Sequence, residues 1–176
     1  NLTQLVSLNL EIPAFRETLV LLTYTIVFFK NLANLSLTLN DTSSQTSQED
    51  LTNFFNALSQ IKGLQSFSFE IGNINLTPES DLCITNQICQ LQKLENLCIT
   101  LNTRTKVLDT AIPEILMDFV KLRKLNKLHL RFLQDDFLFG FKEYRDYKLD
   151  YVLLRLMHFD DIVIQKGPIN VQSRRE

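Results

Sequence analysis

One pattern of apolar residues recurs five times along the chain, with apolar side chains at a first position and at three, six, eight and ten residues after it. The copies begin at Leu2, Phe29, Ile61, Leu91 and Leu122, so their starts are 27, 32, 30 and 31 residues apart. A repeat of nearly constant length in this range is typical of a solenoid, in which each unit buries its apolar face against its neighbours. The pattern therefore predicts a stack of repeats rather than a fold assembled from unrelated segments.

Each repeat contains one predicted strand and one predicted helix. Apolar and polar residues alternate over 35–39, 67–71 and 97–101, and a period of two indicates a half-buried strand. Between the copies, capping residues such as Ser47-x-x-Asp50 precede apolar residues at helical spacing. One strand and one helix per repeat predict a parallel sheet whose connections return through helices.

A less regular sixth unit follows the fifth copy. Apolar residues within 151–159 predict a last helix, and 161–165 a short final strand, before Gly167-Pro168 ends the pattern. We predict a repeat domain over residues 1–166 and a polar C-terminal tail over 167–176. Because Leu2 already occupies an internal-repeat position, where a terminal repeat normally differs, the domain is expected to be part of a longer chain.

The residues of two repeats carry a family resemblance. The strings Leu32-x-x-Leu35-x-Leu37-x-x-Asn40 and Leu94-x-x-Leu97-x-Ile99-x-x-Asn102 resemble the leucine-rich repeat signature, whose Asn hydrogen-bonds the turn after each strand. The period and the helical returns are similar to the ribonuclease-inhibitor-like subclass, and an apolar residue just before the Asn is similar to repeats common in ciliate proteins. The resemblance covers about residues 2–133 and departs from the signature where Pro13 and Leu133 replace the Asn.

The resemblance implies both a fold and a class of function. The implied fold is an α/β leucine-rich repeat solenoid, with a curved parallel β-sheet on the concave side and helices on the convex side. The implied function is non-enzymatic, a protein-interaction or scaffold module within a larger complex.

Composition narrows the location and environment of the chain. The longest dense apolar run, Leu19–Phe29, is far shorter than the roughly 20 residues that span a bilayer, so we predict a buried helix and no membrane partner. Three cysteines without paired spacing favour a reducing, intracellular compartment, cytoplasmic or nuclear. Four Asn-x-Ser/Thr sequons, which mark glycosylation sites in secreted proteins, argue against this location. The chain is rich in Asn, Ser and Thr, however, so two or three sequons are expected by chance.

Residues with the spacing of a catalytic or metal site are scarce. The four glycines are isolated, so no phosphate-binding loop is present, and the two histidines have no neighbouring ligand motif. Adjacent carboxylates at 135–136 and 160–161 are interpreted as solvated turn residues. We predict no catalytic residue, metal, cofactor or small-molecule substrate.

The candidate binding residues are those that the repeat pattern directs away from the core. Side chains alternate across a strand, and stacking aligns the outward ones into columns, although any solvated sheet face would also be polar. The predicted protein-binding residues of the concave face are Asn9, Glu11, Ser36, Thr38, Ser68, Glu70, Cys98, Thr100, Lys127, His129 and Arg131. Phe137, Phe139 and Lys124 are predicted as a secondary contact, with core filling beneath a cap as the alternative for the two aromatics.

Charge suggests two alternative roles. Residues 1–103 carry 4 basic and 9 acidic groups, whereas 104–176 carry 14 and 11, so the solenoid is expected to be electrically polarised along its axis. A run of cations (Lys121, Arg123, Lys124, Lys127 and Arg131) contains no acidic residue. Such a run either satisfies a helix C-terminus or forms a docking patch for an acidic partner or for phosphates. The phosphate alternative implies an accessory subunit of a nucleic-acid-associated complex, although stacking aromatics are missing. Besides the interaction module and the nucleic-acid-associated subunit, a structural subunit of a large assembly is the third alternative for the function.

Overall fold

The computed structural model of the protein describes residues 2–13, 16–40, 47–74, 84–103, 116–133 and 160–166. Within these ranges lie a short 3-10 helix η1 (Leu2–Gln4) and two α-helices, α1 (Arg16–Ile26) and α2 (Gln48–Leu58). Residues 84–88 and 116–119 are also helical. The strands of the described ranges are β1 (Ser7–Pro13), β2 (Asn34–Asn40), β3 (Ser66–Ile74), β4 (Asn96–Thr103), β5 (Lys127–Leu133) and β6 (Asp161–Lys166).

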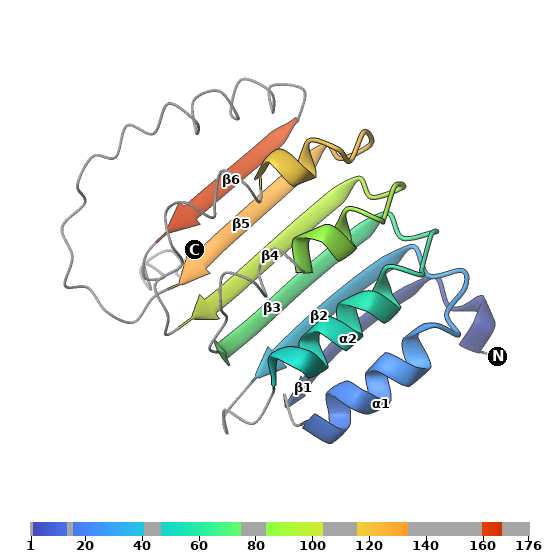
Figure 1. Cartoon of the computed structure of the whole chain (residues 1–176). Coiled ribbons are helices and arrows are strands. Elements are labelled where there is room, and N and C mark those ends of the chain that lie inside the picture. Colours follow the sequence, from blue (N-terminus) through green and yellow to red (C-terminus); the bar gives the residue numbers. More distant parts are fainter. Residues whose placement is uncertain are drawn as a thin grey trace, which may run out of the picture.

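All of these strands belong to one parallel sheet in which each strand lies beside its neighbours in the sequence, in the order β1-β2-β3-β4-β5-β6. The helices cover one face of this sheet (Figure 1). The register pairs equivalent repeat positions, so that Leu37 lies between Leu10 and Phe69. This arrangement confirms the predicted α/β leucine-rich repeat solenoid, and β6 confirms the predicted final strand.

The turns before the strands repeat as faithfully as the strands do. The backbone N–H groups of Ala33 and Asn34 both donate to the carbonyl oxygen of Val6, at 2.8 and 3.0 Å. The carbonyls of Ala33, Gln65, Glu95 and Asn126 each accept two N–H groups of the next repeat in the same way. In the last of these steps the donors are Asp160 and Asp161, so the sixth unit continues the repeat despite its irregular sequence.

The apolar side chains of the strands form the core between the sheet and the helices. Leu35, Leu37 and Leu39 of β2 are 2%, 1% and 0% exposed, because both of its edges and one of its faces are covered. The centre of the core is aromatic, and the rings of Phe55 in α2 and Phe69 in β3 meet edge to face with centroids 5.1 Å apart. The apolar residues of β1 are only partly buried, since this strand has one neighbour.

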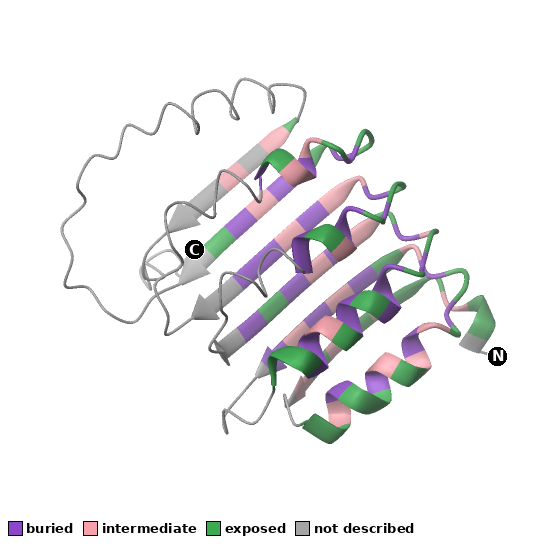
Figure 2. Cartoon of the chain, viewed as in Figure 1, coloured by how far each residue is buried: buried purple, intermediate pink, exposed green. Residues whose placement is uncertain are grey.

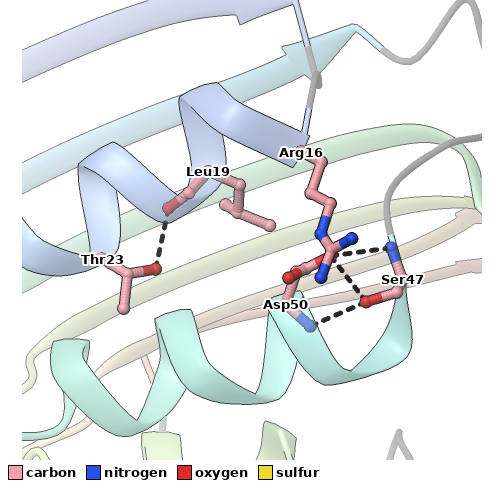
Figure 3. A network of polar contacts seen from close by, with 5 residues as sticks. All are labelled: Arg16, Leu19, Thr23, Ser47 and Asp50. Atoms are coloured by element: carbon pink, nitrogen blue, oxygen red, sulfur yellow. Dashed lines mark hydrogen bonds and ion pairs between the residues drawn. The ribbon is translucent and has the colours of Figure 1, made fainter.

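A polar network joins α1 to α2 (Figure 3). Ser47 is the N-cap of α2 and forms the predicted capping box with Asp50. The Ser47 hydroxyl donates to Asp50 Oδ2 at 2.6 Å and accepts from the Asp50 backbone N–H at 3.1 Å. Arg16 at the start of α1 pairs with the same carboxylate, at 3.4 Å from Nε to Oδ2. The buried Asp50 side chain therefore serves the start of one helix and the contact between two.

The prediction of a buried helix over Leu19–Phe29 is only half right. Leu19, Leu22 and Ile26 face the core, but large apolar side chains on the other side of α1 and in the turn after it are exposed. The predicted helix at 151–159, the aromatics Phe137 and Phe139 and the tail 167–176 lie outside the described residues.

Candidate functional site: the polar strand face

The sheet face opposite the helices is here called the strand face, and its side chains stand in three rows. The register places Ser7, Asn34, Ser66, Asn96, Lys127 and Asp161 in the first row. It places Asn9, Ser36, Ser68, Cys98, His129 and Val163 in the second, and Glu11, Thr38, Glu70, Thr100 and Arg131 in the third. Figure 2 shows the alternation of buried and less buried residues along β2 and β3 that produces these rows. Every predicted concave-face residue thus lies in a row on one surface.

The predicted residues of the strand face differ in how far their side chains are exposed to solvent. The exposed members of the predicted set are Asn9, Glu11, Glu70, Lys127 and Arg131, and the half-buried ones are Ser36, Thr38, Ser68, Cys98 and His129. Thr100 departs from the expectation, because it is only 8% exposed. Its register partners Glu70 and Arg131 carry long side chains that flank the short threonine on both sides. Thr100 therefore belongs to the floor of the face rather than to its accessible surface.

Charge is divided across the strand face. Glu11 of β1 and Glu70 of β3 are exposed on one side, and Lys127 and Arg131 of β5 on the other. Neighbouring strands lie about 4.8 Å apart, so about 10 Å separates Glu70 from Arg131 at the level of the backbone. Small polar side chains fill the space between them. The face therefore has an acidic half and a basic half along the solenoid axis.

A hydrogen-bonded pair of side chains lies at the β6 end of the basic half. His129 Nε2 lies 2.7 Å from Asp161 Oδ2, joining β5 to β6 across the strand face. A carboxylate oxygen accepts, so this hydrogen bond requires the His129 tautomer in which Nε2 is the N–H donor. Sequence reasoning missed this pair. The signal was present, since Asp161 of the sixth unit occupies the repeat position of Lys127, diagonally adjacent to His129.

The run of five cations does not form one surface. Lys121 pairs with Asp118, whose hydrogen bond and negative charge raise the pKa of the lysine. Arg123 and Lys124 are exposed in the turn before β5, and only Lys127 and Arg131 belong to the strand face. Asp161 is moreover the register partner of Lys127. Two of the five cations, Lys121 and Lys127, thus lie beside carboxylates, which weakens the run as a phosphate-binding surface.

Two cysteines within the described ranges are free thiols with different surroundings. Cys98 is half-buried on the strand face. Cys89 is buried on the helix side, and its thiol donates to the carbonyl oxygen of Asp118 at 3.3 Å. Burial, aided by the charge of Asp118, raises the pKa of Cys89 to about 12. Cys89 is therefore a packed, unreactive thiol, and Cys98 is the more accessible of the two.

The described ranges contain no cluster of three or more histidine, cysteine, aspartate or glutamate side chains able to hold a metal ion. No helix in those same ranges is both long enough and apolar enough to cross a membrane. Their chemistry is that of hydrogen bonds and charge pairs on a preformed surface.

A parallel sheet in chain order, helices on one face and polar rows on the other define a protein of leucine-rich repeat fold. No protein-family model matches the sequence. No curated protein matches it either. Among solved structures the chain is similar to internalin C2 from Listeria monocytogenes str. 4b F2365, with 12% sequence identity over 86% of this chain and 70% of that chain. The TM-score of that similarity is 0.36, so the fold assignment relies on the sheet itself.

Proposed function

We propose that the protein is an interaction module that binds a protein partner through the strand face. The observation that supports this proposal is the combination, on one preformed sheet, of a floor of small polar side chains with an acidic and a basic half. Small side chains let a partner approach the sheet, and the inner strands β2 to β5, each paired on both edges, lose little conformational entropy when the sheet binds a partner.

The charges define the chemistry of the partner. Glu11 and Glu70 attract basic groups, and Lys127 and Arg131 attract acidic groups, so the favoured partner carries both signs in the opposite order. Such complementarity sets orientation and association rate more than affinity. The His129–Asp161 pair adds a side-chain link between β5 and β6 beside the basic half.

Finer features of the proposal come from the sequence. We assign the repeats to the ribonuclease-inhibitor-like subclass, similar to repeats of ciliate proteins, because helices connect the strands at a period of about 30 residues. We further propose an intracellular location, which the free thiols of Cys89 and Cys98 favour. Membership of a larger complex follows if the partner is itself part of one.

The test is affinity capture of partners from the native cell, followed by mass spectrometry, with wild type and a charge-swapped variant. The variant carries Glu70→Arg and Arg131→Glu, which reverses one charge in each half of the face at unchanged net charge. The matched control carries Glu49→Lys and Lys93→Glu, a second charge-neutral swap at exposed residues outside the strand face. Circular dichroism confirms that all three proteins are folded to the same extent.

We expect the strand-face variant to lose partners that the control retains. Equal capture by all three proteins would refute the strand face as the binding surface. The nucleic-acid alternative gives a different result, namely steeply salt-dependent binding to nucleic acid that disappears when Lys124, Lys127 and Arg131 are all changed to Glu.

A further inference from the structure

Helix α1 carries an apolar stripe on the side that faces away from the core. Leu21 and Tyr24, together with Phe28 in the turn after the helix, are 64%, 70% and 62% exposed, and Val20 beside them is 36% exposed. The core face of the same helix buries Leu19, Leu22 and Ile26. A helix that is apolar on both sides is normally covered on both sides. The α1 stripe, defined as Leu21, Tyr24 and Phe28, is therefore a surface that lacks its cover.

Comparison with the next repeat shows that the stripe is particular to α1. The repeat offset aligns Leu19, Leu22 and Ile26 with the buried residues Leu51, Phe54 and Leu58 of α2. The same offset aligns the α1 stripe with Asn53, Asn56 and Gln60, which are all exposed. These positions face solvent even in a repeat that has neighbours on both sides. The apolar residues of α1 thus cannot be explained by a missing neighbouring repeat.

The spacing and the end charges of the stripe make it complementary to itself. Glu17, Leu21 and Tyr24 of α1 follow one another at intervals of four and three residues, a spacing that places them on one side of the helix, and Phe28 follows four residues later in the turn after it. Exposed Glu17 lies at one end of this series and exposed Lys30 just beyond the other. The neighbouring Arg16 is directed to Asp50, so the N-terminal end keeps its negative charge.

We propose that the α1 stripe is a dimer interface with a second copy of this chain. A two-fold axis between Leu21 and Tyr24 packs the two helices antiparallel, with Glu17 of each copy near Lys30 of the other. Such an isologous contact closes on itself and forms a dimer rather than a fibre. The stripe and Val20 bury about 400 Å² per copy, about half of what a standard specific interface buries per partner, so the dimer is weak, transient and dependent on concentration.

The dimer adds to the proposed function without depending on it. Since α1 lies on the face of the sheet opposite the strand face (Figure 1), two strand faces in one dimer point away from each other. A dimer with this geometry binds two partner molecules, or two sites on one extended partner. In the second case the overall affinity is higher, because the two binding events are linked.

Sedimentation velocity over 1–200 µM tests the proposal on residues 1–176. Wild type should move from the 20.5 kDa monomer toward twice that mass as the concentration rises. Tyr24→Glu should stay monomeric throughout, whereas the control Asn56→Glu, at the equivalent position of α2, should behave as wild type. A charge pair tests the orientation, because Glu17→Lys and Lys30→Glu should each weaken the dimer at least threefold and restore it when combined.

Three results would overturn the proposal. A wild type that stays monomeric at 200 µM would assign the stripe to a different protein. A dimer that survives Tyr24→Glu would place the contact elsewhere, and a double charge variant no better than the single ones would exclude the antiparallel pair. None of these outcomes bears on the strand face, so either proposal can fail without the other.

Discussion

The carboxylate of Asp50 gives the sharpest prediction about stability, because three donors converge on a single side chain that is 7% exposed. It accepts from the backbone N–H of Ser47 at 3.3 Å, from the Ser47 hydroxyl at 2.6 Å and from Arg16 at 3.4 Å. Removing it in Asp50→Ala leaves the cap half formed, which costs about 1 kcal/mol. Loss of negative charge in the first turn costs about 0.5 kcal/mol.

The ion pair adds little to this total, because Arg16 is 66% exposed and such pairs contribute about 0.5 kcal/mol. We therefore expect Asp50→Ala to lower the free energy of unfolding by about 2 kcal/mol. Asp50→Asn, which retains an acceptor oxygen, should lose about half as much, and Arg16→Ala about 0.5 kcal/mol or less.

Urea unfolding followed by circular dichroism measures these losses as shifts of the midpoint at constant slope. The order Asp50→Ala, Asp50→Asn, Arg16→Ala is the signature of a carboxylate that acts first as a helix cap and second as a charge partner. Asp50→Ala within 0.5 kcal/mol of wild type would refute this reasoning, as would an Arg16→Ala variant that loses as much as Asp50→Ala.

Three further predictions follow from the core and the strand face. Phe69→Ala should cost about 4 kcal/mol in urea unfolding because it empties the centre of the aromatic cluster, whereas Glu70→Ala on the opposite face should stay within about 0.5 kcal/mol. In the native protein at pH 8, iodoacetamide should label Cys98 well before Cys89, and mass spectrometry that finds the reverse order would contradict the burial of Cys89. Since the pKa of Cys89 is raised from 9.0 to about 12, its contribution to stability is complete below pH 9 and is lost as the pH rises toward 12, so Cys89→Ala should show a shallower alkaline decline in unfolding midpoint.

The repeat pattern was sufficient to predict the strands, their parallel order and their register. Positions such as Leu37 and Leu97 are apolar because the sheet buries them, and this requirement recurs in every repeat. The capping box at Ser47 and Asp50 was equally visible, since both of its residues lie within one turn of the chain. These features depend on local chemistry and on a period, which a single sequence displays.

Features that depend on contacts between repeats were not predicted. Thr100 is only 8% exposed between its long register partners Glu70 and Arg131, which its own repeat position does not reveal. The His129–Asp161 pair requires the register of an irregular sixth unit. The exposed stripe on α1 was not predicted, because a run as apolar as Leu19–Phe29 is normally interpreted as buried on all sides.

Side-chain footprinting of the complex with a captured partner is the most direct test of the central claim, that the strand face binds a protein. Carbodiimide labels the carboxylates Glu70 and Glu49, and an amine-reactive reagent labels Lys127 and Lys93, in the free protein and in the complex. We predict that labelling of Glu70 and Lys127 falls on binding while Glu49 and Lys93 stay unchanged. Unchanged labelling of Glu70 and Lys127, with protection of the other two, would contradict the proposed binding surface.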